Sequence, residues 1–280
     1  MRIPLREILN SNVELYAKEN LYYQKHLSNS DIFEKLYLEL RKTEGRLYSD
    51  KVVKKFPEIS SNHIHQKEWA IRKTSMDQLI SYLRGNTHLN RMLEVGCGNG
   101  WLSNNLARAV PIEICGIDIN ETELKQASRL FHSDRLSFIN ANIMESIFPV
   151  KTFDVIIMAS SIQYFPSLNL ILKKLQELLT SSGEIHILDS PLSYSIIEAN
   201  ENQKRSNCYF ESLGLPEMSN YYFYHTINEF AGFNYTLMYN PKSLLTFFRN
   251  RISRKHMSPF PWFKIANTRN SKSLITPNQL

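Results

Sequence analysis

The sequence lacks any apolar run that approaches the roughly 18–20 residues of a membrane-spanning helix. Its first residues, MRIPLREILNSNVEL, lack the apolar centre that a secretory signal needs, so we expect a cytoplasmic protein. Cysteine is also scarce, because the chain contains only Cys97, Cys115 and Cys208, which are widely separated. This odd, scattered set favours reduced thiols over a disulfide framework and has no zinc-finger spacing.

The sequence does contain enough apolar material for a sizeable core. Hydrophobic residues make up 42% of the 280 and charged residues 21%, so a wholly disordered chain is excluded. The net charge is +6, but residues 91–190 are slightly acidic between two basic flanks. We therefore do not expect nucleic acid to run over the centre, whereas the flanks can meet an anionic ligand or surface.

Residues 91–190 alternate between short apolar runs and amphipathic stretches. Five runs have strand length, namely RMLEVG, EICGID, LSFINA, DVIIMA and EIHILD, and residues 99–109, 121–131 and 168–180 between them have helical spacing. This alternation predicts βαβ units and a Rossmann-like α/β fold with a mostly parallel sheet. NYTLMY and PWFKIA follow, separated by a short helix at 242–250. We therefore predict seven strands, of which the last is antiparallel.

The two ends of the chain flank this α/β domain, which we place at residues 86–267. Residues 1–85 have helical patterning and are expected to form an N-terminal extension over the carboxyl edge or one face of the sheet. An aromatic-rich cap segment is expected at 191–232, because residues 209–239 hold ten of the 32 aromatic residues. These rings form either the core of the cap or a cage for a substrate. Residues 268–280 form a polar tail.

A glycine-rich motif, LEVGCGNG, lies where the first strand of the sheet turns into the first helix. Glycines there allow a tight bend and let a ligand approach main-chain N–H groups. Asp118 ends the next strand, at the edge where α/β sheets bind ligands, and suits two ribose hydroxyls. The G-x-G-x-G spacing, with Glu94 before it, differs from the G-x-G-x-x-G of dinucleotide enzymes. A carboxylate in this place suits a cationic amino-acid group better than a pyrophosphate.

LEVGCGNGWLS resembles the first motif of class I S-adenosylmethionine-dependent methyltransferases, and the resemblance covers residues 91–190 in order. It implies S-adenosylmethionine as the cofactor. The cofactor-binding residues that it implies are Glu94, Gly96, Cys97, Gly98, Asp118, Ile119, Asn142, Ile143 and Ser160. In this assignment the glycines flank the methionine part, Asp118 binds the ribose, and Ile119 packs on the adenine.

The resemblance also assigns the later segments. Asn142 stands where the family often has an acid that meets the adenine amino group, and an amide oxygen can still accept from that amine. Ile143 would supply a backbone N–H to the ring, and Ser160 would lie near the sulfonium. Gln163 and Tyr164 would face the substrate.

Several other residues could have either a functional or a purely structural role. Cys97 is read as a small loop residue rather than a nucleophile. His63 and His65 have an H-x-H spacing but no partner to complete a site, so no metal is expected. Arg72 either reaches the cofactor carboxylate or has a structural or solvated role.

The loop after the fourth strand reads ASSIQYF and lacks the D/N-P-P-Y/F tetrad of methylases that act on exocyclic amines of nucleic acids. This favours a small-molecule, lipid or glycan acceptor. Nothing fixes a general base, and Tyr164 is the single catalytic candidate, as a hydroxyl that orients the acceptor or as a hydrophobic wall. A basic run is a candidate contact for an anionic group or an acidic membrane surface: Arg249, Arg251, Arg254, Lys255 and His256.

Two other functions remain open at this point. A related S-adenosyl-type transferase, such as one that moves an aminopropyl group, would need an acidic site that DVIIMASSIQYF does not supply. A cofactor-binding protein without turnover would act through the additions at the two ends of the chain. The oligomeric state is left open.

Overall fold

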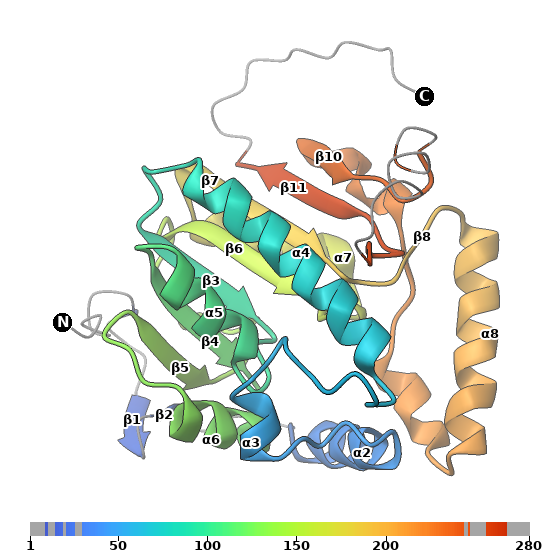
Figure 1. Cartoon of the computed structure of the whole chain (residues 1–280). Helices are drawn as coiled ribbons and strands as arrows, with labels where there is room; N and C mark the ends of the chain where they lie inside the picture. The colour runs from blue at the N-terminus through green and yellow to red at the C-terminus, as the bar shows by residue number, and fades with distance from the viewer. Residues whose placement is uncertain are drawn as a thin grey trace.

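The computed structural model describes residues 9–10, 15–18, 21–25, 30–243, 246 and 256–267. Nine strands of this part of the chain form one sheet, in the order β1-β2-β5-β4-β3-β6-β7-β11-β10 (Figure 1). Their bounds are β1 Leu15–Lys18, β2 Leu21–Gln24, β3 Arg91–Val95, β4 Glu113–Asp118, β5 Leu136–Asn140, β6 Phe153–Ala159, β7 Leu179–Leu188, β10 Tyr235–Tyr239 and β11 Trp262–Ala266. A separate two-stranded ladder pairs β8 (Leu192–Ser193) with β9 (His225–Thr226).

The helices connect and cover these strands. The α-helices are α2 Ser30–Thr43, α3 Asp50–Val53, α4 Gln66–Arg84, α5 Trp101–Ala109, α6 Glu121–Leu130, α7 Leu168–Leu178 and α8 Ile196–Ser212. In the described part of the chain there are three short 3-10 helices, η1 Ile162–Tyr164, η2 Pro216–Tyr221 and η3 Ile227–Gly232. None of the helices described is long and apolar enough to cross a membrane.

The centre of the sheet is parallel, as the strand–helix alternation predicts. β3 pairs with β4 and β6 on its two sides, and β5 and β7 extend the sheet outward from them. The central strands are buried on both faces, which explains why their sequences are continuous apolar runs instead of alternating ones. The carboxyl ends of all five strands therefore meet at one edge of the sheet.

The antiparallel last strand is also confirmed. β11 lies between β7 and β10 and runs antiparallel to both, with Phe263 opposite Ile187. Phe263 and Ile265 of this strand are fully or almost fully buried. Most of the helix expected at 242–250, four of the five basic residues at 249–256, and the tail 268–280 lie outside the described residues.

The predicted number of strands is wrong, and so is the wholly helical N-terminal region. β1 and β2 form an antiparallel pair, and β2 joins the sheet parallel to β5, with Leu21 opposite Phe138. Burial alternates along β2, because Leu21 and Tyr23 are buried while Tyr22 and Gln24 are half-buried. A four-residue run of this period is too short to be distinguished from a helical turn by sequence pattern.

Two helical layers cover the sheet. Residues of α4, α5 and α6 pack in one hydrophobic cluster on the face that Figure 1 shows in front, whereas α7 packs in the other cluster behind the sheet. Leu79 and Leu83 of α4 are almost fully buried, and the apolar stripe of α7 is buried on the opposite side. The sequence predicts N-terminal helices over the carboxyl edge or one face of the sheet, and α4 packs on a face.

The additions at the two ends of the chain meet each other across the carboxyl edge. A third hydrophobic cluster joins Leu40 of α2 with Phe210 of α8 and Met218 of η2. Half-buried rings pack against this cluster: Phe33, Tyr164, Tyr221 and Tyr222. In Figure 1, α2 lies below the sheet and α8 stands at its right-hand side. Residues of the aromatic-rich segment thus share a hydrophobic cluster with α2.

Candidate active site

The turn between β3 and α5 can be built only from glycines at its key positions. Gly96, Gly98 and Gly100 have φ angles of 74°, 51° and 71°, in the left-handed region that favours glycine. A Cβ atom on Gly96 would lie 2.5 Å from the Cβ of Ser161, and one on Gly98 would lie 2.9 Å from Oε2 of Glu123. The backbone of this turn is therefore closely packed on one side, while the turn lines cavities on the other.

Asp118 ties the end of β4 to this turn. Its Oδ2 accepts a hydrogen bond from the Gly98 N–H at 2.8 Å, and its Oδ1 accepts one from the Asn120 N–H at 2.8 Å. Burial raises the pKa of Asp118, and these backbone N–H groups act in the opposite direction. A carboxylate has about four acceptor positions, so capacity remains for hydroxyl donors from the adjoining cavity.

That cavity has a volume of about 330 Å³ and is mainly apolar at its walls. It brings together the predicted residues of the adenosine side, namely Asp118, Ile119, Asn142 and Ile143. Asn142 Oδ1 already accepts from the Met144 N–H at 3.0 Å, so one of its acceptor positions is used within the loop. Phe33, Phe165 and Tyr221 complete the walls, and none of these three was predicted as a site residue.

A second cavity of about 120 Å³ adjoins the first and is polar. The predicted residues Glu94, Cys97 and Ser160 line it, together with residues that sequence reasoning did not assign to cofactor binding: Tyr37, Arg41, Arg46, Glu68, Asn99, Glu123 and Gln163. Asn99 Oδ1, Gln163 Oε1 and Arg41 Nε are buried without a hydrogen-bond partner among the described residues. These unsatisfied donors and acceptors suit a ligand that carries both an ammonium and a carboxylate group.

Glu94 lies beneath this polar cavity. Its side chain is 3% exposed, and Oε2 accepts a hydrogen bond from the Ser103 hydroxyl. Burial raises its pKa to about 8, although the bond from Ser103 acts in the opposite direction. Cys97 is also buried, with a pKa raised by burial, and its Sγ packs against Gly116. Its thiol is therefore suited to packing rather than nucleophilic attack.

Two arginines that line the polar cavity, Arg46 of the loop after α2 and Arg72 of α4, share the carboxylate of Glu68. Glu68 of α4 accepts from Arg46 at 2.5 Å and from Arg72 at 3.0 Å, and Arg46 also contacts Glu44 at 3.1 Å. Arg72 thus lines the cavity while its Nε is held by Glu68. The ion pair with Glu68 gives Arg72 a structural role, and contact with a cofactor carboxylate stays a prediction.

Glu123 is the main residue that sequence reasoning missed. It follows Asn120, whose Oδ1 caps α6 by accepting from the Glu123 N–H at 2.9 Å. In a capping box the glutamate would turn back to the Asn120 N–H, but Asp118 already occupies that donor. The Glu123 side chain, 8% exposed, instead approaches the Tyr37 hydroxyl, with 3.5 Å between the oxygens. The Asn-x-x-Glu spacing was the available signal, but it indicates only a helix start.

Hydrogen bonds hold the loop after β6 in a strained backbone conformation. Ser160 and Asp189, at the ends of adjacent strands, have φ angles of 55° and 51°, and the Ser160 hydroxyl donates to the Asp189 carbonyl at 2.6 Å. The Ser75 hydroxyl of α4 donates to Asp189 Oδ1 at 2.7 Å. Non-glycine residues with φ angles in the left-handed region often mark functional sites. The loop thereby presents Ser160 and Tyr164 to both cavities.

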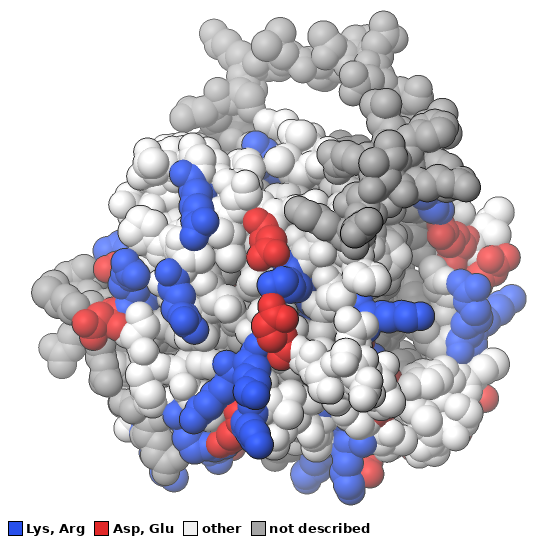
Figure 2. Space-filling model, in the orientation of Figure 1, with Lys and Arg blue, Asp and Glu red and all other residues white. Residues whose placement is uncertain are grey.

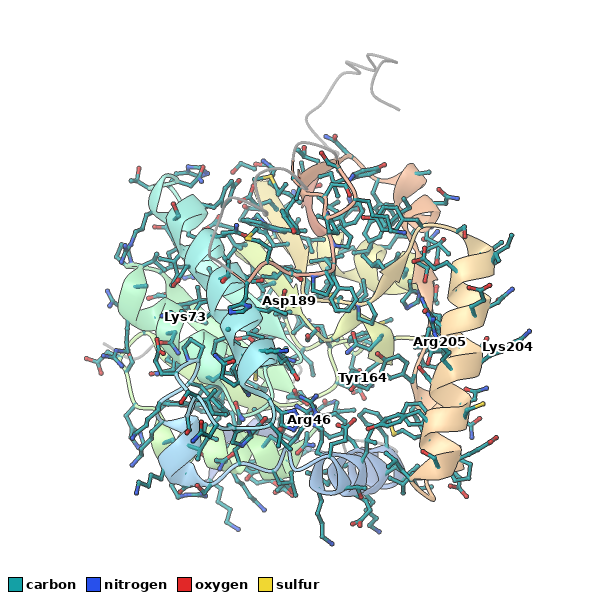
Figure 3. All side chains as sticks on the ribbon, turned by 45° about the vertical axis from the view of Figure 1, so that its right-hand side comes forward. Arg46, Lys73, Tyr164, Asp189, Lys204 and Arg205 are labelled. Carbon is teal, nitrogen blue, oxygen red and sulfur yellow. The ribbon has the colours of Figure 1, made fainter. Side chains whose placement is uncertain are left out.

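Tyr164 is surrounded by rings. Its ring lies 5.7 Å from that of Tyr37 and 5.7 Å from that of Tyr222, in edge-to-face geometry. Burial raises its pKa, so the phenol is protonated and can donate a hydrogen bond. Figure 3 shows Tyr164 in the space between α4 and α8.

The two histidines of the H-x-H pair make hydrogen bonds within the protein. The His63 Nδ1 accepts from the His65 N–H at 3.1 Å, and His65 Nε2 contacts the Glu44 carbonyl at 2.8 Å. Both rings pack near Tyr48. In the described residues no group of three or more His, Cys, Asp or Glu side chains is placed to hold a metal ion.

Comparison with known families agrees with this geometry. A family model described as "Methyltransferase domain" matches residues 86–232, which is more than half of the chain. The chain belongs to this methyltransferase family. The resemblance of its glycine motif to S-adenosylmethionine-dependent methyltransferases is thereby confirmed, and S-adenosylmethionine is the cofactor that the family implies.

Individual relatives match over shorter stretches. Malonyl-[acyl-carrier protein] O-methyltransferase of Priestia megaterium is 30% identical over 118 residues, which cover 41% of this chain and 43% of that protein. Fatty-acid O-methyltransferase of Mycolicibacterium smegmatis is 29% identical over 109 residues, which cover 39% of this chain and 40% of that protein. The matches therefore span less than half the length of these curated relatives.

A solved structure shares the fold over a longer stretch. Geranyl diphosphate C-methyltransferase from Streptomyces coelicolor A3(2) superposes with a TM-score of 0.51 at 12% identity, over 82% of this chain and 97% of that one. At this identity the likeness describes the fold alone.

Proposed function

We propose that this chain transfers the methyl group of S-adenosylmethionine to a small-molecule or lipid acceptor at the carboxyl edge of its sheet. One observation carries the proposal: a mainly apolar cavity and a polar cavity adjoin at the glycine turn. Their chemistry matches a molecule with an adenosine part and an amino-acid part. The family assignment supplies the same cofactor independently.

The residues present fit this cofactor. Asp118 retains acceptor capacity for the ribose hydroxyls, and Ile119 and Ile143 offer apolar walls for the adenine. On the polar side, the unpartnered oxygens of Asn99 and Gln163 suit an ammonium group, and Arg41 and Arg72 suit a carboxylate. When bound, S-adenosylmethionine supplies an electrophilic methyl group.

The protein's contribution is to align the acceptor and to exclude water. The rings of Phe33, Tyr37, Tyr164 and Tyr221 pack on one another at the cavity walls, which supports a dry reacting centre. The protonated Tyr164 hydroxyl is proposed to orient the acceptor. No step of this account needs a general base when the acceptor is already deprotonated.

The acceptor is proposed to enter between α2, α4 and α8, over the loop that carries Tyr164. The aromatic walls favour an apolar or ring-bearing acceptor. Arg205 lies on the inner side of α8, toward Tyr164, whereas its neighbour Lys204 points outward (Figure 3). Arg205 is exposed, and its Nη2 donates to Asn202 Oδ1, so the guanidinium retains donors for an anionic group of the acceptor.

A small acceptor also fits the charges of the visible surface better than a nucleic acid does. On the face drawn in Figure 2, Lys and Arg side chains are interspersed with Asp and Glu, without a continuous basic strip. Nucleic-acid binding depends mainly on such a strip. The proposed peripheral contact with an anionic membrane rests on a basic run that lies mostly outside the described residues.

The function is tested by a methyl-transfer screen. Purified protein is incubated with S-adenosylmethionine labelled in its methyl group and with pools of carboxylic acids, phenols, apolar alcohols and glycans. We expect label in one acceptor class, and loss of that label in Asp118→Ala. Binding of S-adenosylmethionine without transfer to any pool would instead favour a cofactor-binding protein without turnover.

A further inference from the structure

The two cavities share a small set of lining residues. These are Tyr37, Gly96, Gly98, Glu123, Ser160 and Tyr164. If the apolar cavity receives adenosine and the polar one the amino-acid part, the atom between those parts lies at this junction. In S-adenosylmethionine that atom is the sulfonium, which carries a positive charge. In the product, S-adenosylhomocysteine, the same sulfur is neutral.

Glu123 brings a carboxylate to this junction. A Cβ atom on Gly98 would lie 2.9 Å from its Oε2, so the carboxylate directly abuts the glycine turn. Asn120 and Asp118 satisfy the start of α6 without the Glu123 side chain. The Tyr37 hydroxyl, with 3.5 Å between the oxygens, is the one hydrogen-bond partner found for the Glu123 side chain in the described part of the chain. A buried carboxylate with so little hydrogen bonding is costly unless a cation compensates for it.

Two phenol rings complete the junction. Tyr37 and Tyr164 are 5.7 Å apart at an interplanar angle of 82°. Aromatic faces attract cations through the quadrupole of the ring, and this attraction grows when water is excluded. A sulfonium cannot donate a conventional hydrogen bond. A negatively charged carboxylate and the electron-rich faces of two rings are therefore groups that suit it.

A resident arginine is the competing explanation for Glu123. The Arg41 guanidinium lies over the Tyr37 ring, 5.4 Å from its centroid, and its charge acts on Glu123. Its ion-pair partner in the described residues, however, is Glu44, at 4.0 Å. Arg41 therefore shares the neighbourhood of Glu123 without an ion pair between them in the described residues.

We propose that Glu123, with the rings of Tyr37 and Tyr164, selects the positively charged cofactor over its neutral product. This inference rests on the proposed function and assigns to its site a means of limiting product inhibition. The charge difference between the two ligands is confined to one atom. Removal of the Glu123 charge should therefore weaken one ligand and spare the other.

Titration calorimetry on the full chain tests this with three ligands: S-adenosylmethionine, S-adenosylhomocysteine and sinefungin, in which a carbon that bears an amine replaces the methylated sulfur. Wild-type protein should bind the two cationic ligands more tightly than S-adenosylhomocysteine. In Glu123→Gln, affinity for both cationic ligands should fall about tenfold, while that for S-adenosylhomocysteine stays within about twofold. Glu121→Gln, on the same helix but outside both cavities, is the matched control and should change none of the three.

The outcomes separate the inference from the function on which it rests. If Glu123→Gln weakens all three ligands equally, the carboxylate only supports the glycine turn, and unchanged affinities would equally overturn the inference. If wild-type protein binds neither S-adenosylmethionine nor its product, the proposed function itself fails. Retained binding of S-adenosylhomocysteine shows that the variant is folded. Should it not fold, Tyr37→Leu provides the second test. Loss of this half-buried ring should reduce the ratio of the affinity for S-adenosylmethionine to that for S-adenosylhomocysteine.

Discussion

Asp118 has two tasks at the scale of single residues, because one carboxylate both holds the Gly98 N–H and faces the adenosine-side cavity. Asp118→Ala should weaken S-adenosylmethionine binding by about 1–3 kcal/mol, since charge-assisted hydrogen bonds to the ribose are lost. Titration calorimetry measures this loss. An affinity equal to that of wild type would show that the ribose is bound elsewhere.

The buried acids of the site make the stability of the ligand-free protein depend on pH. Burial raises the pKa of Glu94 to about 8 and that of Glu123 to about 7. Glu94 faces Ser103 and Asp118, and Glu123 faces charged or phenolic groups of α2, α4 and β4: Tyr37, Arg41, Arg72 and Asp118. Above the ordinary glutamate pKa the unfolded chain releases these protons first, so the free energy of unfolding falls as the pH rises toward 8.

Thermal unfolding between pH 5 and 8 checks this expectation. The Tm of the ligand-free protein should fall across the interval because of these two groups. In Glu94→Gln the fall should be smaller, because a neutral amide replaces the group with the higher pKa. If Glu94→Gln has the same pH dependence as wild type, Glu94 is not a buried acid with a raised pKa.

At the scale of elements, some aromatic rings of the segment 209–239 are buried in a hydrophobic cluster and others line the apolar cavity. Phe210 is 4% exposed in the cluster shared by α2 and α8, whereas Tyr221 is half-buried and lines the apolar cavity. Phe210→Ala should therefore cost about 3–5 kcal/mol of stability. Tyr221→Ala should largely spare the Tm and reduce turnover or acceptor affinity. Equal losses of stability in both variants would make the segment a structural cap alone.

Helix α8 offers two adjacent cations with different surroundings. Arg205 lies on its inner side and Lys204 on its outer side (Figure 3). With an anionic acceptor, Arg205→Gln should raise KM for that acceptor by about tenfold and leave kcat little changed, since a binding contact is lost. Lys204→Gln is the matched control and should behave as wild type. The same KM in both variants would place the acceptor away from α8.

The sequence predicts the elements whose signals are local. The glycine turn, the buried strands and Asp118 follow from residue types at fixed spacing. The antiparallel last strand follows from the connection between NYTLMY and PWFKIA, in which the sequence predicts only a short helix and not a long crossover helix of the usual kind. The β1–β2 pair does not, because four-residue strands depend on pairing with β5, more than a hundred positions away. Tyr37, Arg41 and Glu123 were missed for the same reason. Their role depends on how α2 folds back over the sheet edge, which no local pattern encodes.

At the scale of the whole molecule, the proposed cofactor site lies at the carboxyl edge of the sheet, where α2 meets α8 and η2. α2 precedes the region that matches the methyltransferase domain, residues 86–232, and packs on η2, which lies near the C-terminal end of that region. Substrate selection is thus expected to depend on the additions. Cofactor binding is expected to use both the shared core, through Asp118, and the N-terminal addition, through Tyr37 and Arg41. The matches with the curated relatives cover less than half the length of each.

The central claim is that the glycine turn binds S-adenosylmethionine, and titration calorimetry of that ligand against wild type and Gly96→Val tests it most directly. Wild-type protein should bind with roughly micromolar affinity, without measurable binding of NAD. Gly96→Val should abolish binding, because a side chain there would meet Ser161 in a turn with a φ angle of 74°. Gly232→Val is the control, since a Cβ there has no atom within 4 Å in the described residues. The absence of S-adenosylmethionine binding to wild type, or equal binding by Gly96→Val, would contradict the account.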